Sequence, residues 1–180
     1  MDKKIKSITQ NNIGYTGIVK LSQYTKNKKF KIAEIHNEGG KPLFDFLADC
    51  LIGNFTVAAT NRPNKIALLN INDEAGQVTV EAAEGTSFIY LLTAPEKVYN
   101  ENAGVVRYSF IIPQEYFAGV GGAVRFNAIG LYLGSATTVD DYAACCKVDT
   151  KDWSISISSV LVLDWELHIA NNFKDDGENI

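Results

Sequence analysis

The sequence predicts a mainly β protein: an antiparallel β-sandwich, jelly-roll or Ig-like, with one short amphipathic helix near residues 42–53. Three observations lead to this prediction. Several segments alternate apolar and polar residues with a period of two, which is typical of half-buried strands. Turn-forming residues separate these segments, and many short strands joined by turns favour a sandwich over a βαβ arrangement. One segment has helical spacing instead.

The clearest strand signal begins near residue 160. The apolar residues that share one face of this strand are Leu161, Leu163, Trp165, Leu167 and Ile169. The polar residues that share the opposite face are Asp164, Glu166 and His168. Just before this strand, Ile155 and Ile157 alternate with serines, and they form either its beginning or a partner strand. The segment is therefore predicted to be a long strand with one buried face.

A second strand is predicted over residues 105–112. Its apolar face holds Val106, Tyr108, Phe110 and Ile112, and its other face holds Arg107 and Ser109. Pro113 ends the strand because proline has no N–H to donate to a ladder. The further strand candidates are residues 15–22, 29–36, 65–71, 77–81, 86–93, 126–133 and 141–148.

Residues 42–53 break the two-residue pattern. The apolar residues that recur there at helical spacing are Leu43, Phe46, Leu47, Cys50 and Leu51, with Phe44 widening the stripe. Pro42 suits the first helical position, and Gly53 suits the residue after the C-terminal cap. Asp45 lies near the positive end of the helix dipole. We expect about three turns of helix that pack onto one side or end of the sandwich.

The chain of 180 residues is long enough for one domain with a sizeable core. We expect a polar N-terminal arm over residues 1–12, a β-sandwich domain over residues 13–170 and an acidic tail over residues 171–180. Both ends are expected to be loose, or ordered only against neighbouring subunits. No stretch has the pattern of a signal peptide or the length of an apolar membrane span. We therefore predict synthesis in a cytoplasm, without membrane insertion.

Charge is distributed unevenly along the chain. Residues 1–41 hold nine lysines and three acidic residues, a net +6, whereas the whole chain carries -4 and residues 42–180 therefore carry -10. A basic segment can bind nucleic acid or an acidic partner. It can also be a solvated edge strand whose lysines discourage edge-to-edge pairing. We prefer the edge strand and predict no specific nucleic-acid partner, because residues 1–41 contain no arginine and few aromatic residues.

Candidate catalytic groups are few. The two histidines, His36 and His168, lack the spacing of a metal box, and no Gly-x-Ser-x-Gly elbow is present. The carboxylate pairs at residues 140–141 and 175–176 fit a turn and an acidic tail better than a calcium loop. The glycine-rich residues 119–122 fit a turn better than a phosphate-binding loop. We therefore predict no catalytic, cofactor-binding or metal-ligating residue, no cofactor and no enzymatic activity.

Three cysteines, Cys50, Cys145 and Cys146, make an odd count. They lack the spacing of a zinc knuckle or a thioredoxin-type motif. In a strand, Cys145 and Cys146 would point to opposite faces. We interpret all three as core thiols in a reducing compartment.

Two stretches resemble small structural proteins of tailed bacteriophage particles. The first, residues 17–53, runs from a strand through a lysine-rich turn and a second strand into His36-Asn37-Glu38-Gly39-Gly40 and the helix. The second, residues 107–169, contains Phe126-Asn127-Ala128-Ile129-Gly130-Leu131-Tyr132 and then Asp164-Trp165-Glu166-Leu167. It is similar to the F-N-E-I-G-L-Y strand and the closing Trp-Glu strand of phage tail-associated and fibre-associated proteins. Ala128 stands where that motif has glutamate, so no role of the carboxylate carries over.

The resemblance implies a structural, non-catalytic component of a tailed bacteriophage virion, from a crAss-like or other gut-bacterial phage. Such a protein acts through subunit packing in a head appendage or decoration, a neck ring, or the tail or baseplate. It is assembled in the bacterial host cytoplasm. Its expected partners are further copies of itself and other virion structural proteins.

Two other functions stay open. A carbohydrate-binding or adhesin β-sandwich that recognises a host-surface glycan would need aromatic residues exposed on one side. The candidates are Trp153, Tyr99, Tyr116 and Tyr142. A small hydrolase would need a pocket where carboxylates meet His36, His168 or Cys50 with shifted pKa values. No motif in the sequence indicates such a pocket.

Overall fold

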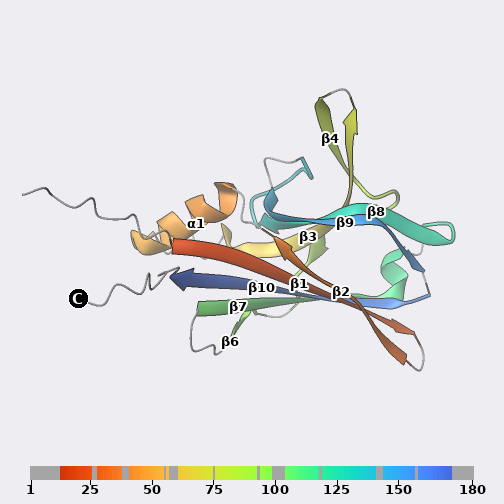
Figure 1. The fold of residues 1–180 in the computed structure, drawn as a ribbon, viewed down its shortest axis with the longest axis horizontal. Coiled ribbons are helices and arrows are strands. Elements are labelled where there is room, and N and C mark those ends of the chain that lie inside the picture. Colours follow the sequence, from red (N-terminus) through yellow and green to blue (C-terminus); the bar gives the residue numbers. More distant parts are fainter. Residues whose placement is uncertain are drawn as a thin grey trace, which may run out of the picture.

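The computed structural model describes most of the chain. The described residues are 13–25, 28–37, 41–54, 56, 61–74, 76–92, 94–98, 104–117, 119–140, 144–156 and 158–171. Their elements form two antiparallel sheets and one short α-helix (Figure 1). This confirms the prediction of a mainly β chain with a short helix. The predicted arm, residues 1–12, and residues 172–180 of the predicted tail lie outside the described residues.

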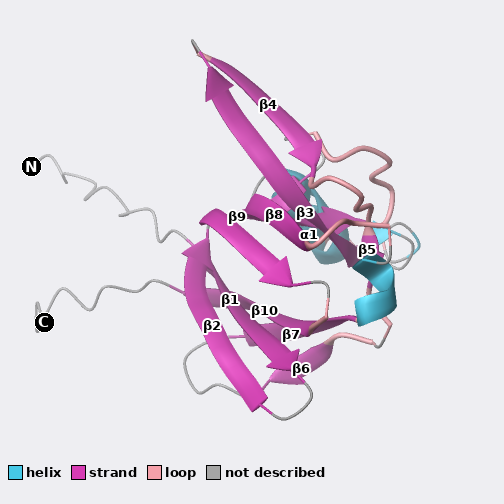
Figure 2. Ribbon diagram, turned by 90° about the vertical axis from the view of Figure 1, so that its right-hand side faces the viewer, coloured by secondary structure: helices cyan, strands magenta, loops and turns pink. Residues whose placement is uncertain are grey.

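Each sheet contains only antiparallel neighbours. The first sheet has the order β2 (Lys28–Asn37), β1 (Ile13–Thr25), β10 (Val160–Asn171), β7 (Gly104–Ile112) and β6 (Glu96–Val98). The second sheet has the order β4 (Gln77–Ala82), β3 (Pro63–Glu74), β8 (Ala123–Leu133) and β9 (Ala144–Ser156), and β5 (Ile89–Tyr90) also pairs with β3. Figure 2 shows the two sheets one above the other. The last strand, β10, lies in the middle of the first sheet, so the two ends of the described chain pair side by side.

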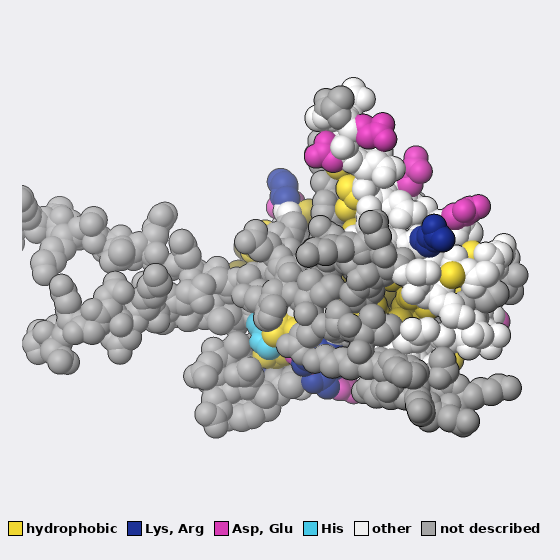
Figure 3. Space-filling model, turned by 45° about the vertical axis from the view of Figure 1, so that its right-hand side comes forward, with side chains coloured by type: hydrophobic (Ala, Val, Ile, Leu, Met, Phe, Trp, Pro, Cys, Tyr) yellow, Lys and Arg dark blue, Asp and Glu magenta, His cyan; other side chains and the backbone are white. Residues whose placement is uncertain are grey.

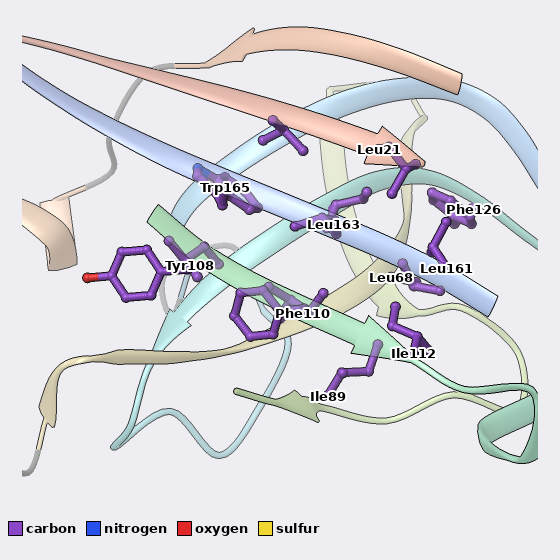
Figure 4. Close-up of a cluster of buried hydrophobic side chains, with 14 of the residues drawn as sticks. Leu21, Leu68, Ile89, Tyr108, Phe110, Ile112, Phe126, Leu161, Leu163 and Trp165 are labelled. Carbon is purple, nitrogen blue, oxygen red and sulfur yellow. The ribbon is translucent and has the colours of Figure 1, made fainter. Parts of the chain in front are cut away.

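The two sheets share one main hydrophobic core (Figure 4). The buried residues on the predicted apolar faces of β10 and β7 are Leu161, Leu163, Trp165, Leu167, Tyr108, Phe110 and Ile112. The second sheet contributes Ile66, Leu68, Val124, Phe126, Ile129 and Leu131 to the same core. The two-residue alternation in the sequence therefore identified the buried faces of β10 and β7 correctly. The side chain of Ile169 lies outside the described residues.

The helix forms where the sequence predicted it, as α1 over Lys41–Leu51. Gly53 follows it with a φ of 81°, a left-handed conformation that favours glycine after a helix. The helix side chains that pack into or against the main core are Leu43, Phe46 and Leu47. Leu51 is 86% exposed, which corrects the prediction that the whole apolar stripe faces the core. Leu51 lies in the last turn of α1, which extends beyond the part of the helix that packs on the core.

One predicted strand is much shorter than expected. Among the described residues of the range 86–93, only the two of β5 form a strand, and they pair with Lys65 and Ile66 of β3. β4 already pairs with β3 from Leu69 onward, which limits how far β5 can extend along the same edge of β3. The sequence pattern showed that this segment is apolar, but it could not predict that β4 and β5 share one edge of β3.

The segment before the last strand belongs to the other sheet. Ile155 is buried in β9, which pairs with β8, so it is neither the beginning of β10 nor its partner. Ile157 lies outside the described residues. Two short elements were not predicted at all: β6 and a 3-10 helix, η1 (Gln114–Phe117), which follows Pro113.

Candidate functional site

Three strands of the first sheet bring charged residues together on the face away from the main core. Glu166 of β10 is only 4% exposed although it lies on the polar face of its strand. Its Oε1 accepts hydrogen bonds from Nε and Nη2 of Arg107 at 3.0 and 2.8 Å. Its Oε2 accepts one from Nζ of Lys20 at 3.0 Å and lies 3.3 Å from Nε2 of His168. We call these four residues the Glu166 cluster.

The electrostatics of the Glu166 cluster favour a carboxylate that is charged at neutral pH. Burial raises the pKa of Glu166, but hydrogen bonds from Arg107, Lys20 and His168 outweigh it and lower the pKa from 4.5 to about 2. The hydrogen bond to Glu166 in turn raises the pKa of Arg107. A general acid or base works best with a pKa near the operating pH. The arrangement instead suits an ion-pair network that holds β1, β10 and β7 in register.

Both histidines lie in the first sheet. His168 is on the polar face of β10, as predicted, and belongs to the Glu166 cluster. His36 lies in β2, and its side chain is outside the described residues. The nearby hydroxyl of Ser109 donates to Oδ1 of Asp164 at 2.6 Å, so it is bonded to a carboxylate and not to an imidazole. The described residues of this face therefore form no Ser–His pair.

The second sheet carries a smaller hydrophobic cluster on the face away from the main core. Its buried members are Ala67, Leu69, Ala128 and Tyr132. The partly buried residues that pack against them are Ile71, Val80, Phe88, Ala136 and Val139. We call this set the outer cluster. The ring of Tyr132 meets that of Phe88 edge-on, with centroids 5.0 Å apart, and its hydroxyl donates to the Val139 carbonyl at 3.2 Å.

The outer cluster gives a packing reason for the Phe126–Tyr132 motif. Asn127 lies at a bulge in β8, where its Oδ1 accepts from the Ile71 N–H at 2.7 Å and its Nδ2 donates to the Ile71 carbonyl at 2.8 Å. The amide thereby continues the β3–β8 ladder where the backbones separate. A Cβ on Gly130 would stand 2.5 Å from Cε2 of Tyr132, so only glycine leaves room for the ring. Ala128, 1% exposed, is a buried member of the same cluster.

Replacing Gly130 by alanine should destabilise the chain by about 1–3 kcal/mol, because the added methyl group overpacks a ring that is fully buried. Chemical denaturation of the purified chain measures this loss. Gly121→Ala is the matched control, since a Cβ there meets nothing within 4 Å. The Tyr132→Ala background should remove most of the Gly130→Ala penalty. An equal penalty in both backgrounds would contradict the proposed contact.

Lys65 is a buried cation that the sequence analysis did not single out. It is 4% exposed, and burial lowers its pKa. Its Nζ donates to the Gly134 carbonyl at 3.1 Å and to the Ala136 carbonyl, and it lies 4.6 Å from the centre of the Phe88 ring. These contacts hold the turn after β8 against the outer cluster. A lysine inside the apolar run of β3 was the signal in the sequence.

A groove of about 910 Å³ lies between the base of the β3–β4 hairpin and the glycine-rich residues 119–122. Asn70, Glu84 and Arg125 supply its polar side chains. Gly122 has a φ of 90°, which agrees with the predicted turn. These groups can hydrogen-bond a polar ligand. The residues described around the groove include no aromatic ring for a sugar to stack on.

The remaining candidates do not converge on one site. Tyr116 is partly buried, and its hydroxyl accepts from the Ser87 N–H at 2.9 Å. Cys50 is a partly buried free thiol. β9 contains Cys145, Cys146 and Trp153, but their side chains lie outside the described residues. Tyr99 and Tyr142 lie wholly outside the described residues. Among the residues with described positions, no group of three or more His, Cys, Asp and Glu could hold a metal ion.

Comparisons with known proteins add no relative. No protein-family model matches the chain, and neither the curated proteins nor the solved structures give a match. In the described part of the chain, no helix has the length and apolar character needed to cross a membrane.

Proposed function

We propose that this chain is a jelly-roll or Ig-like β-sandwich that serves as a structural, non-catalytic component of a tailed-bacteriophage virion. It acts through packing between subunits, with copies of itself and with other virion proteins as partners. The proposal rests on the motifs at residues 17–53 and 107–169 and on the packing roles that the structure gives to Asn127 and Gly130.

One observation carries the assembly part of the proposal. Large apolar side chains are exposed on elements at the surface: Leu51 and Ile52 at the end of α1 are 86% and 78% exposed, and Val78 of β4 is 55% exposed. Contiguous exposed apolar surface commonly marks contacts between proteins, and Leu51 and Ile52 are neighbours in the chain. The groove brings three polar side chains together but no described aromatic ring, so we prefer assembly to glycan recognition.

The purified chain is expected to form assemblies with at least twice the 19.8 kDa mass of one chain. Size-exclusion chromatography with light scattering measures this mass directly, over a range of protein concentrations. Mass spectrometry of phage particles from a host that produces the chain tests the virion part. A chain that stays monomeric at every concentration and is missing from such particles would refute the proposal.

A further inference from the structure

The β3–β4 hairpin projects from the body of the molecule (Figures 1 and 2). Beyond Leu69 it consists only of the two paired strands, and Gly76, with a φ of 80°, helps to close its turn. Among the described strands, β4 pairs with β3 alone. The outer backbone edge of β4 therefore faces away from the rest of the second sheet.

The hairpin has an apolar face that continues the outer cluster away from the body. Ile71 lies opposite Val80, and both belong to the outer cluster. One step further out, Val78 lies opposite Asp73 and is 55% exposed. A two-stranded hairpin of this size is only marginally stable without a surface to pack on. Its apolar face is therefore suited to contact another surface.

The charge of the β3–β4 hairpin indicates which kind of surface it can contact. Residues 70–82 contain Asp73, Glu74 and Glu81, all exposed, and no lysine or arginine. Figure 3 shows acidic side chains gathered on this projection. The β1–β2 hairpin has the opposite character, because Lys28, Lys29 and Lys31 fall within the first four residues of β2. The one chain thus carries an acidic hairpin and a basic hairpin.

We propose that the β3–β4 hairpin is an assembly arm that docks onto the basic β1–β2 hairpin of a second copy of this chain. The inference rests on the self-association part of the proposed function and names the surfaces that make it. Two acidic arms repel each other, so a contact between two identical arms is unfavourable. A contact between two different surfaces of identical chains is head-to-tail, and it closes into a ring when the rotation between copies allows.

Two charge-reversal variants of the full chain test this contact. The arm variant carries Asp73→Lys and Glu74→Lys, and the acceptor variant carries Lys28→Glu and Lys29→Glu. We expect each variant alone to fall to the 19.8 kDa mass of one chain by light scattering. Mixing the two variants should restore association to a mass above 19.8 kDa, because in an alternating assembly each reversed hairpin meets a partner of opposite charge.

The control variant carries Gln114→Lys and Glu115→Lys on the exposed residues of η1 and should keep the wild-type mass. Circular dichroism confirms that every variant remains folded. An arm variant that keeps its mass would assign the hairpin to a different partner and overturn the inference, while the proposed function stands. A mixture of the two variants that stays monomeric would also overturn the inference, and so would a control variant that dissociates. A wild-type chain that is monomeric at every concentration overturns the inference, and it refutes the proposed function as well when the chain is also missing from phage particles.

Discussion

Replacing Trp165 by alanine is expected to destabilise the chain by about 3–5 kcal/mol, among the largest effects of a single substitution in this molecule. Trp165 is fully buried and lies between Val19 of β1 and Tyr108 of β7, in the middle of the first sheet. Alanine would leave a cavity in the main core that both sheets line. Denaturation at one fixed protein concentration measures the loss, because self-association also shifts apparent stability.

The indole nitrogen of Trp165 provides a second substitution at the same position. Among the described residues, its Nε1 is buried without a hydrogen-bond partner. An unpaired buried donor is itself costly, so Trp165→Phe removes that cost together with part of the ring. We expect Trp165→Phe to cost about 1–2 kcal/mol, well below the alanine variant. Leu92→Ala is the control, since Leu92 is 77% exposed. Equal losses for Trp165→Ala and Leu92→Ala would show that this core position does not support the fold.

The strands that period-two alternation predicted best are those with one buried face. In β10, Leu161, Leu163, Trp165 and Leu167 occupy every second position and all four are buried in the main core, whereas Val162 between them is not part of it. β8 departs from this rule after Asn127, where the second sheet has apolar residues on both faces. A strand buried on both sides shows a continuous apolar run, which predicts a strand but not which side chain faces which cluster. The outer cluster was missed for that reason.

The Glu166 cluster shows why a site on a sheet is hard to predict from one sequence. Glu166, Arg107 and Lys20 come from three strands, and 146 positions separate Lys20 from Glu166 along the chain. Alternation placed Glu166 and Arg107 on polar faces correctly. The alternation does not predict the order of strands in a sheet. The cluster depends on that order, because β1 and β7 are the two neighbours of β10. The burial of Glu166 follows from that order.

The Glu166 carboxylate should make the stability of the chain fall with acid. Its pKa is lowered in the folded chain from 4.5 to about 2, so the unfolded chain takes up this proton first as the pH drops. The contribution is therefore complete above about pH 5 and is lost progressively as the pH falls toward 2. A shift of this size corresponds to about 3 kcal/mol. Arg107 and Lys20 are each about one-third exposed, and water can solvate them, so the net effect is nearer 2 kcal/mol.

Glu166→Gln separates this contribution from that of every other carboxylate. The variant keeps the size of the side chain but removes its charge, so it should be less stable than the wild type by about 2 kcal/mol near pH 7. The two proteins should then converge in stability as the pH falls toward 2, because the folded wild type takes up the proton only near its lowered pKa of about 2. Glu81→Gln on exposed β4 is the control and should follow the wild type at every pH. A stability gap that persists unchanged in acid would mean that Glu166 acts through its shape and not through its charge.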